Sequence, residues 1–242
     1  MIPSFAQQSA APSGTQTSQT QPTTQPSSEQ VLHQEEKQRA PGVVPLFGMT
    51  SVHNAPPLSS HQKFQLMAKT MIDPFTFVSA GLTAGLGQAT NAFAQYGQGA
   101  AGYGKRYGAA LADNADSNFF SNYAYPVLFK EDPRYFRLGE GTLRKRLFYS
   151  LAQVAVARKD AGGHTFNFAN VLGAFTAGTI SNIYYPSNDH GVGLTASRAG
   201  TALAYGSVGN LFLEFWPDID QKWFHKRQNQ AHPAEPPGGP PK

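Results

Sequence analysis

The sequence predicts an all-α protein, a bundle of about five or six helices with disordered N- and C-terminal tails. Three observations lead to this class. Apolar residues recur at helical spacing, capping residues and prolines stand where such helices would begin or end, and small residues recur at every fourth position in the least charged stretches. Because positions four apart share one face of a helix, these glycines and alanines form small-xxx-small strips along which helices can pack closely.

Composition restricts the kind of protein further. Of the 242 residues only 14% are charged, against about a quarter in average soluble proteins, and the formal net charge is +4. The basic residues do not form one dense run, so we expect no nucleic-acid partner. The chain has no cysteine, which excludes disulfides, thiolate metal sites and a cysteine nucleophile. No spacing of histidines or carboxylates indicates a metal site, no motif indicates a cofactor, and no small-molecule ligand can be named.

The chain begins with segments that are poor in large apolar residues. Residues 1–41, rich in Gln, Ser, Thr and Pro, should form a disordered tether, because they cannot bury enough surface to offset the entropy lost on ordering. A small-x-small triplet at 4–6 has the form of a signal-peptidase site, so residues 1–6 are either a signal-peptide remnant or an ordinary disordered terminus. Residues 42–57 should form an extended strap, and the helical domain is expected at 58–227.

The first two helices of the domain are predicted around a proline. Ser59 or Ser60 can cap a helix that ends near Ile72, and Pro74 suits the first turn of the next helix. This second helix is uncharged over most of its length and should break between residues 96 and 104, where four glycines cluster. The packing positions predicted along it are Gly81, Gly85, Ala89, Ala100, Gly104 and Gly108.

The middle of the chain is predicted to be less regular. Residues 114–129 mix turn-forming residues with aromatics and predict irregular structure. Thr142 can cap a helix that runs to about Arg158. Three cations at 144–146 lie in the first turns of that helix, where the helix dipole disfavours them, which indicates either an anion nearby or a solvated surface.

Two further uncharged helices should complete the bundle. One is expected from Phe168 to Tyr185 and ends at Pro186, and the other is expected from Leu194 to Phe215. Both repeat the four-residue spacing of small side chains. The packing positions predicted on them are Gly173, Ala177 and Gly200.

The sequence leaves the surroundings of this bundle open. Gln, Asn, Thr and Gly dilute every uncharged segment, so both an embedded bundle and a soluble or peripherally bound one remain. An amphipathic helix is expected from Pro217 to Arg227, with Trp223 and Phe224 as an interfacial anchor, and residues 228–242 should form a disordered tail. We expect membrane or envelope components as partners, and the small-residue strips leave a homo-oligomer open.

Four segments stand out for their mixture of aromatic, charged and amide residues. They are DPRYFRLGEG from Asp132, FNFANVLG from Phe166, ISNIYYP from Ile180 and EFWPDI from Glu214. Together they resemble a group of uncharacterised exported envelope proteins from acidobacteria, over residues 58–227. The resemblance brings no activity with it. It implies an exported protein of the periplasm or outer membrane, with a non-enzymatic structural or membrane-associating role.

A second set of residues leads to the alternative function. Lys130 and Arg137 have the spacing K-x6-R, His164 follows in a Gly-His-Thr triplet, and Arg198 comes last, after a serine. This order resembles the motifs of the type 2 phosphatidic acid phosphatase superfamily, an all-helical group whose members often lie in membranes. The resemblance implies that the lysine and the two arginines hold a phosphate ester and that the histidine is a general acid.

The resemblance to the phosphatases is degenerate. The position of their nucleophilic histidine is occupied by Ala204, so the alternative is a protein that binds or hydrolyses a phosphate ester with a damaged site. The two functions predict different geometry. If the protein is an enzyme of this kind, the four residues should converge on one pocket, and if its role is structural, they should be scattered.

Overall fold

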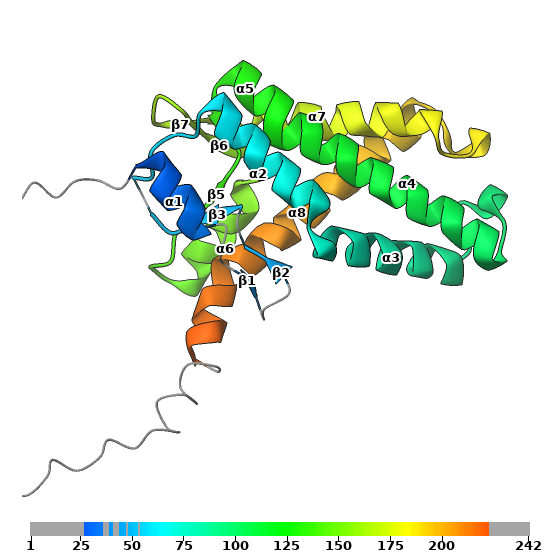
Figure 1. The fold of residues 1–242 in the computed structure, drawn as a ribbon, viewed down its shortest axis with the longest axis horizontal. Coiled ribbons are helices and arrows are strands. Elements are labelled where there is room, and N and C mark those ends of the chain that lie inside the picture. Colours follow the sequence, from blue (N-terminus) through cyan, green and yellow to red (C-terminus); the bar gives the residue numbers. More distant parts are fainter. Residues whose placement is uncertain (1–26, 36–38, 41–43, 47, 53, 223–242) are drawn as a thin grey trace, which may run out of the picture.

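The computed structural model describes residues 27–35, 39–40, 44–46, 48–52 and 54–222 (Figure 1). The predicted signal-peptide remnant, the predicted tail at 228–242 and the aromatic pair of the predicted anchor lie outside these residues. Helices dominate the described part and pack as a bundle, with short strands at one end. The predicted all-α class is therefore confirmed.

A short helix lies in the segment that was expected to be a tether. α1 (Ser28–Glu35) packs on the domain through Val31 and Leu32, which are both almost completely buried. Leu32 forms an apolar cluster with Leu58 and Leu66. The folded unit thus begins before residue 58, because two adjacent apolar side chains of this polar segment are buried against the domain.

Two-residue strands connect α1 to the domain. β1 (Arg39–Ala40) pairs antiparallel with β2 (Val44–Pro45). β3 (Met49–Thr50) pairs in parallel with β5 (Tyr135–Phe136), which comes from the middle of the chain. Within the described part of the predicted strap, β3 is hydrogen-bonded to β5 and turns lie at Gly48 and Asn54.

Helices α2 (Ser60–Ile72) and α3 (Pro74–Ala89) begin where the sequence predicts. The hydroxyl of Ser59 accepts a hydrogen bond from the Gln62 N–H, and the Gln62 side chain accepts one from the Ser59 N–H, which makes a capping box. The side chain of Asp73 caps α3. These local signals are sufficient to place both helix starts.

One long helical run follows. After a 3₁₀ turn, η1 (Ala94–Tyr96), α4 (Gly99–Phe119) passes directly into a π-helix, η2 (Phe120–Ala124), and then into α5 (Tyr125–Phe129). The prediction of irregular structure over 114–129 is wrong. The amides that suggested turns donate instead to oxygens one turn earlier in the helix: Asn114 to Ala110, Asn118 to Asn114 and Asn122 to Asn118.

A small antiparallel sheet interrupts the helices, with strands in the order β4 (Glu131–Asp132), β6 (Val156–Lys159) and β7 (His164–Phe166). α6 (Leu143–Ala152) begins after its predicted cap, Thr142, but does not reach Arg158. The helix stops early because residues 156–159 pair with a strand on each side.

Helices α7 (Phe168–Ile180) and α8 (Val192–Asp220) complete the fold, joined through the 3₁₀ turns η3 (Ser181–Ile183) and η4 (Ser187–Asp189). The prediction that Pro217 would begin a separate helix is wrong, since α8 continues through it. In the same turn the guanidinium groups of Arg137 and Arg146 donate to the carbonyl oxygen of Glu214. Side chains of the neighbouring segments thus hydrogen-bond to the helix backbone next to the carbonyl of Leu213, which loses its helical donor at Pro217.

Most of the helices belong to one of two parts, which Figure 1 shows. We call α3, α4, α7 and α8 up to residue 213 the helical layer. Within this layer α3 packs along α4, α4 packs against α7, and α7 packs along α8. We call α1, the strands, α6 and the end of α8 from residue 214 the base. The helical layer projects away from the base, so the two parts offer different surfaces to their surroundings.

Candidate functional site

The structure separates the two arginines of the predicted phosphate site. Arg137 donates to the backbone carbonyl of Glu214 and to the carboxylate of Asp218. Arg198 lies near the other end of α8 and donates to the hydroxyl of Ser181. Arg198 and Glu214 are sixteen residues apart on one helix, which puts their Cα atoms roughly 24 Å apart. One phosphate group cannot contact both arginines.

The other two predicted residues lie at the small sheet. Lys130 ends α5 with a positive φ of 55°, and its side chain is exposed. His164 is exposed on β7, opposite Arg158 of β6. Neither side chain has a hydrogen bond or ion pair with the described residues. Asp160, four residues before His164 in the sequence, forms an ion pair with Lys63. The four predicted residues are thus scattered over the molecule.

The predicted packing positions differ in what surrounds them. A methyl group on Gly173 would overlap the hydroxyl of Ser121 and lie 2.9 Å from the Ser121 backbone nitrogen, and one on Gly81 would lie 3.3 Å from the Tyr103 hydroxyl. A methyl group on Gly85 would lie 4.0 Å from the Tyr103 ring. At Gly104, Gly108 and Gly200, apart from the adjoining residues and the backbone of the same helix, no heavy atom of the described part of the chain lies within 4 Å of such a methyl group. Among the alanines, Ala177 is buried, whereas Ala89 and Ala100 are exposed.

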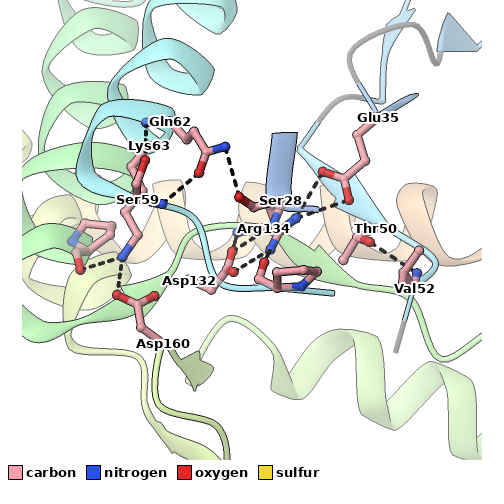
Figure 2. Close-up of polar contacts among 12 residues, drawn as sticks. Ser28, Glu35, Thr50, Val52, Ser59, Gln62, Lys63, Asp132, Arg134 and Asp160 are labelled. Carbon is pink, nitrogen blue, oxygen red and sulfur yellow. Dashed lines mark hydrogen bonds and ion pairs between the residues drawn. The ribbon is translucent and has the colours of Figure 1, made fainter. Parts of the chain in front are cut away.

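Figure 2 shows a buried ion cluster that the sequence analysis missed. Arg134 is fully buried, and its Nε and Nη2 donate to the carboxylate of Asp132 at 3.0 and 2.8 Å. Its Nη1 lies 3.3 Å from Glu35 of α1, and burial raises the pKa of Glu35 although Arg134 opposes the rise. This cluster ties α1 to β4 within the base.

A second buried cation holds α2 in place (Figure 2). Lys63 is 2% exposed, and its ammonium group donates to the carboxylate of Asp160 at 2.6 Å and to the carbonyl of Pro126 at 3.3 Å. These contacts join α2 to α5 and to the turn between β6 and β7. The lysine is therefore part of the packing between elements.

The largest cluster surrounds Glu214, which is completely buried. Its carboxylate accepts hydrogen bonds from the Tyr135 hydroxyl at 2.8 Å, the Leu138 N–H at 2.9 Å, the Gly139 N–H at 3.0 Å and the Arg146 Nε at 2.7 Å. Burial raises the pKa of the Glu214 carboxyl, but Arg146, Tyr135 and the two N–H groups outweigh it and hold this pKa below its usual value. The segments DPRYFRLGEG and EFWPDI thus form two halves of one buried cluster.

Charged side chains of the helical layer also point inward. The hydroxyls of Tyr184 and Tyr185 donate to Asp113 at 2.7 and 2.6 Å, and burial raises the pKa of Asp113. Arg198 lies over the Tyr185 ring, 4.2 Å from its centre. Arg106 is buried and donates to carbonyl oxygens of its own helix and of the preceding loop. Apart from the exposed Lys105, the charged side chains of the layer thus have partners inside the protein.

The packing of the helical layer is inverted relative to an ordinary globular core. Its buried apolar side chains are all alanine: Ala80, Ala84, Ala109, Ala110, Ala169, Ala174, Ala177 and Ala199. Large apolar side chains are exposed instead, and we call the following set the apolar exterior: Phe77, Val78, Leu82, Leu86, Leu172, Phe175, Tyr205 and Val208. In globular cores Leu, Ile, Val and Phe are usually buried. The long uncharged runs of the sequence are the only pattern that points to this inverted packing. The spacing of small residues alone does not indicate which side chains face outward.

No helix in the described part of the chain combines the length and the apolarity needed to cross a bilayer. The described residues also contain no group of three or more His, Asp or Glu placed to hold a metal ion.

Comparison of the chain with family models, with curated proteins and with solved structures finds no match.

Proposed function

We propose that the protein is a non-enzymatic, membrane-associating component of the cell envelope, whose helical layer lies in the apolar part of a membrane while its base stays in water. The observation that carries this proposal is the inverted packing, with alanine inside and Leu, Val and Phe outside. In water each exposed Å² of apolar surface costs about 25 cal/mol relative to burial. In lipid, helices pack through small residues and turn large apolar side chains toward the acyl chains.

The placement of charges supports the same arrangement. Helices α3 and α7 carry no Asp, Glu, Lys or Arg. Within α4 and the first part of α8, Arg106, Asp113, Asp116 and Arg198 have polar partners inside the protein. Apolar surroundings demand such internal satisfaction, because no water is present to solvate the groups. The exposed Lys105 has a stem long enough to reach toward an interface.

The location in the envelope rests on the four segments that resemble exported proteins. Two of these segments meet in the Glu214 cluster, which gives them a structural reason to occur together. The phosphatase alternative receives no support from the geometry, because Arg137 donates to Glu214 near the C-terminal end of α8, whereas Arg198 lies in the N-terminal part of α8 and donates to Ser181.

Vesicle flotation tests the membrane placement. We expect the wild-type protein to float with vesicles of phosphatidylcholine and phosphatidylglycerol, and the double variant Leu82→Glu/Leu86→Glu to lose most of the bound fraction. A charge at the centre of a bilayer costs about 2.5–3.5 kcal/mol.

The matched control is the double variant Leu128→Glu/Leu143→Glu, which adds the same charges outside the helical layer at side chains that are 66% and 72% exposed. This control should float like the wild type, and circular dichroism verifies that both variants fold. The proposal fails if the wild-type protein stays at the bottom of the gradient, or if both double variants float equally.

A further inference from the structure

A cavity of about 310 Å³ lies where the helical layer meets the base. Its wall comes from α2, η2, the strands β4 and β6, the start of α7 and the middle of α8. This volume is at the lower end of the range for small-molecule binding sites. None of the four residues of the predicted phosphate site lines it.

The wall of this cavity is rich in side chains that can both donate and accept hydrogen bonds: Thr70, Ser121, Asn122, Gln153, Asn167, Asn170 and Asn210. Three of them, Ser121, Gln153 and Asn210, are half-buried and have no side-chain hydrogen bond with any described residue. Polar groups at such positions are satisfied by water or by a ligand.

In two further amides, the nitrogen donates to the protein and the oxygen has no donor in the described part of the chain. Nδ2 of Asn122 donates to Oδ1 of Asn118 at 2.8 Å, and Nδ2 of Asn170 donates to the carbonyl of Val154 at 2.9 Å. The Oδ1 atoms of Asn122 and Asn170 accept no hydrogen bond within the described part of the chain. The amide planes are thus fixed while one oxygen of each remains open to a bound molecule.

The π-helix gives this wall its shape. η2 carries both Ser121 and Asn122, and it touches α7 at Gly173, where even a methyl group would overlap the serine hydroxyl. π-Helical turns occur frequently at functional sites because they shift side chains out of the regular helical register. The close contact fixes the position of the turn and therefore of the two polar side chains.

The charges in the wall cancel. The carboxylates of Glu131 and Asp132 are matched by the guanidinium groups of Arg134 and Arg158. Asp132 is bound on both oxygens by Arg134, and Glu131 accepts a hydrogen bond from the N-terminal turn of α7. A charged ligand would find no surplus of opposite charge to offset its desolvation. The cavity therefore favours a neutral molecule.

We propose that the cavity binds an uncharged, polyhydroxylated small molecule of the size of one sugar ring, with Ser121, Gln153 and Asn210 in contact with its hydroxyl groups. A hydroxyl group donates and accepts, as do the side chains that face it. Val156 and Leu213 supply apolar surface for the C–H groups of the ring. This binding does not depend on the membrane placement of the helical layer.

Isothermal titration calorimetry tests the proposal, with glucose and N-acetylglucosamine as uncharged probes and protonated glucosamine as the charged counterpart. We expect saturable binding of at least one uncharged probe, and much weaker binding of glucosamine. Asn210→Ala and Gln153→Ala each remove one unpartnered amide, so each should weaken binding about threefold to tenfold. Both variants should fold normally, because no hydrogen bond within the protein is lost.

Asn188→Ala is the matched control, since it removes an exposed amide outside the cavity, and it should bind like the wild type. The proposal is overturned if neither uncharged probe binds saturably. It is also overturned if glucosamine binds as tightly as the neutral sugars, or if both cavity variants bind like the wild type.

Discussion

At the scale of single residues, Glu214 joins segments that lie far apart in the chain. Tyr135 comes from β5, Leu138 and Gly139 from the following loop, and Arg146 from α6. A carboxylate in such a position is stable only while all of its oxygens have donors, because a buried charge without partners is costly. Two of the four segments that stand out in the sequence, DPRYFRLGEG and EFWPDI, are therefore explained by burial and pairing.

Replacing this carboxylate by an amide tests the cluster. Glu214→Gln keeps the shape of the side chain but removes the buried negative charge that Arg146 Nε contacts, and it leaves Arg146 with Asp218 as its remaining carboxylate partner. We expect a loss of about 3 kcal/mol in the free energy of unfolding, measured with urea. Glu140→Gln, which changes an exposed glutamate in the adjacent loop, should stay within about 0.5 kcal/mol of the wild type. Equal stability of the two variants would refute the structural role of Glu214.

The lowered pKa makes this loss depend on pH. Because the folded-state pKa of Glu214 lies below the ordinary value of 4.5, the ionised form is favoured in the folded state. Its contribution is complete above pH 4.5 and is lost as the pH falls through the folded-state pKa. The stability difference between the wild type and Glu214→Gln should therefore be constant above pH 4.5 and shrink as the pH falls through the folded-state pKa. A difference that does not change with pH would be inconsistent with this pairing.

At the scale of elements, local signals placed the helix starts, and tertiary contacts decided the rest. The caps at Ser59, Asp73 and Thr142 were predictable because each side chain acts on its own helix. The run α4–η2–α5 was not, since its asparagines and aromatics are equally typical of turns. Contact between η2 and α7 at Gly173 favours the helical form, and no spacing within one segment reports it.

Two glycine substitutions separate close packing from helix propensity. Gly173→Ala must displace η2, so we expect it to lower the unfolding free energy by about 1–3 kcal/mol. Gly104→Ala adds its methyl group in open space on a regular helix, so it should raise that free energy by about 0.5–1 kcal/mol. Urea unfolding of both variants measures the difference, and a stabilised Gly173→Ala variant would be evidence against the close contact.

At the scale of the whole molecule, the sequence predicted a bundle with small-residue strips but not which surface faces outward. Gly173 lies against another helix, whereas Gly104, Gly108 and Gly200 face open space, although all four repeat the same spacing. A strip of small residues shows where a second helix can approach closely without steric overlap. Whether a helix lies there depends on the rest of the fold. The four residues of the predicted phosphate site do not lie together for a related reason. The spacing K-x6-R does not determine where each side chain lies in the fold or which groups it contacts.

The inverted packing gives the helical layer an apolar outer surface. Alanines fill the contacts inside the layer, and leucine and phenylalanine side chains face outward. Because the chain has no cysteine, single cysteines can be introduced at Leu82 in the helical layer and at Leu143 in the base and labelled with a fluorophore. The most direct measurement is quenching of each label by brominated lipids in vesicles.

Membrane placement predicts strong quenching at residue 82, little quenching at residue 143, and solvent exposure of both labels when vesicles are absent. Equal, weak quenching at both positions would contradict it, and so would a label at residue 82 that is already shielded in vesicle-free protein.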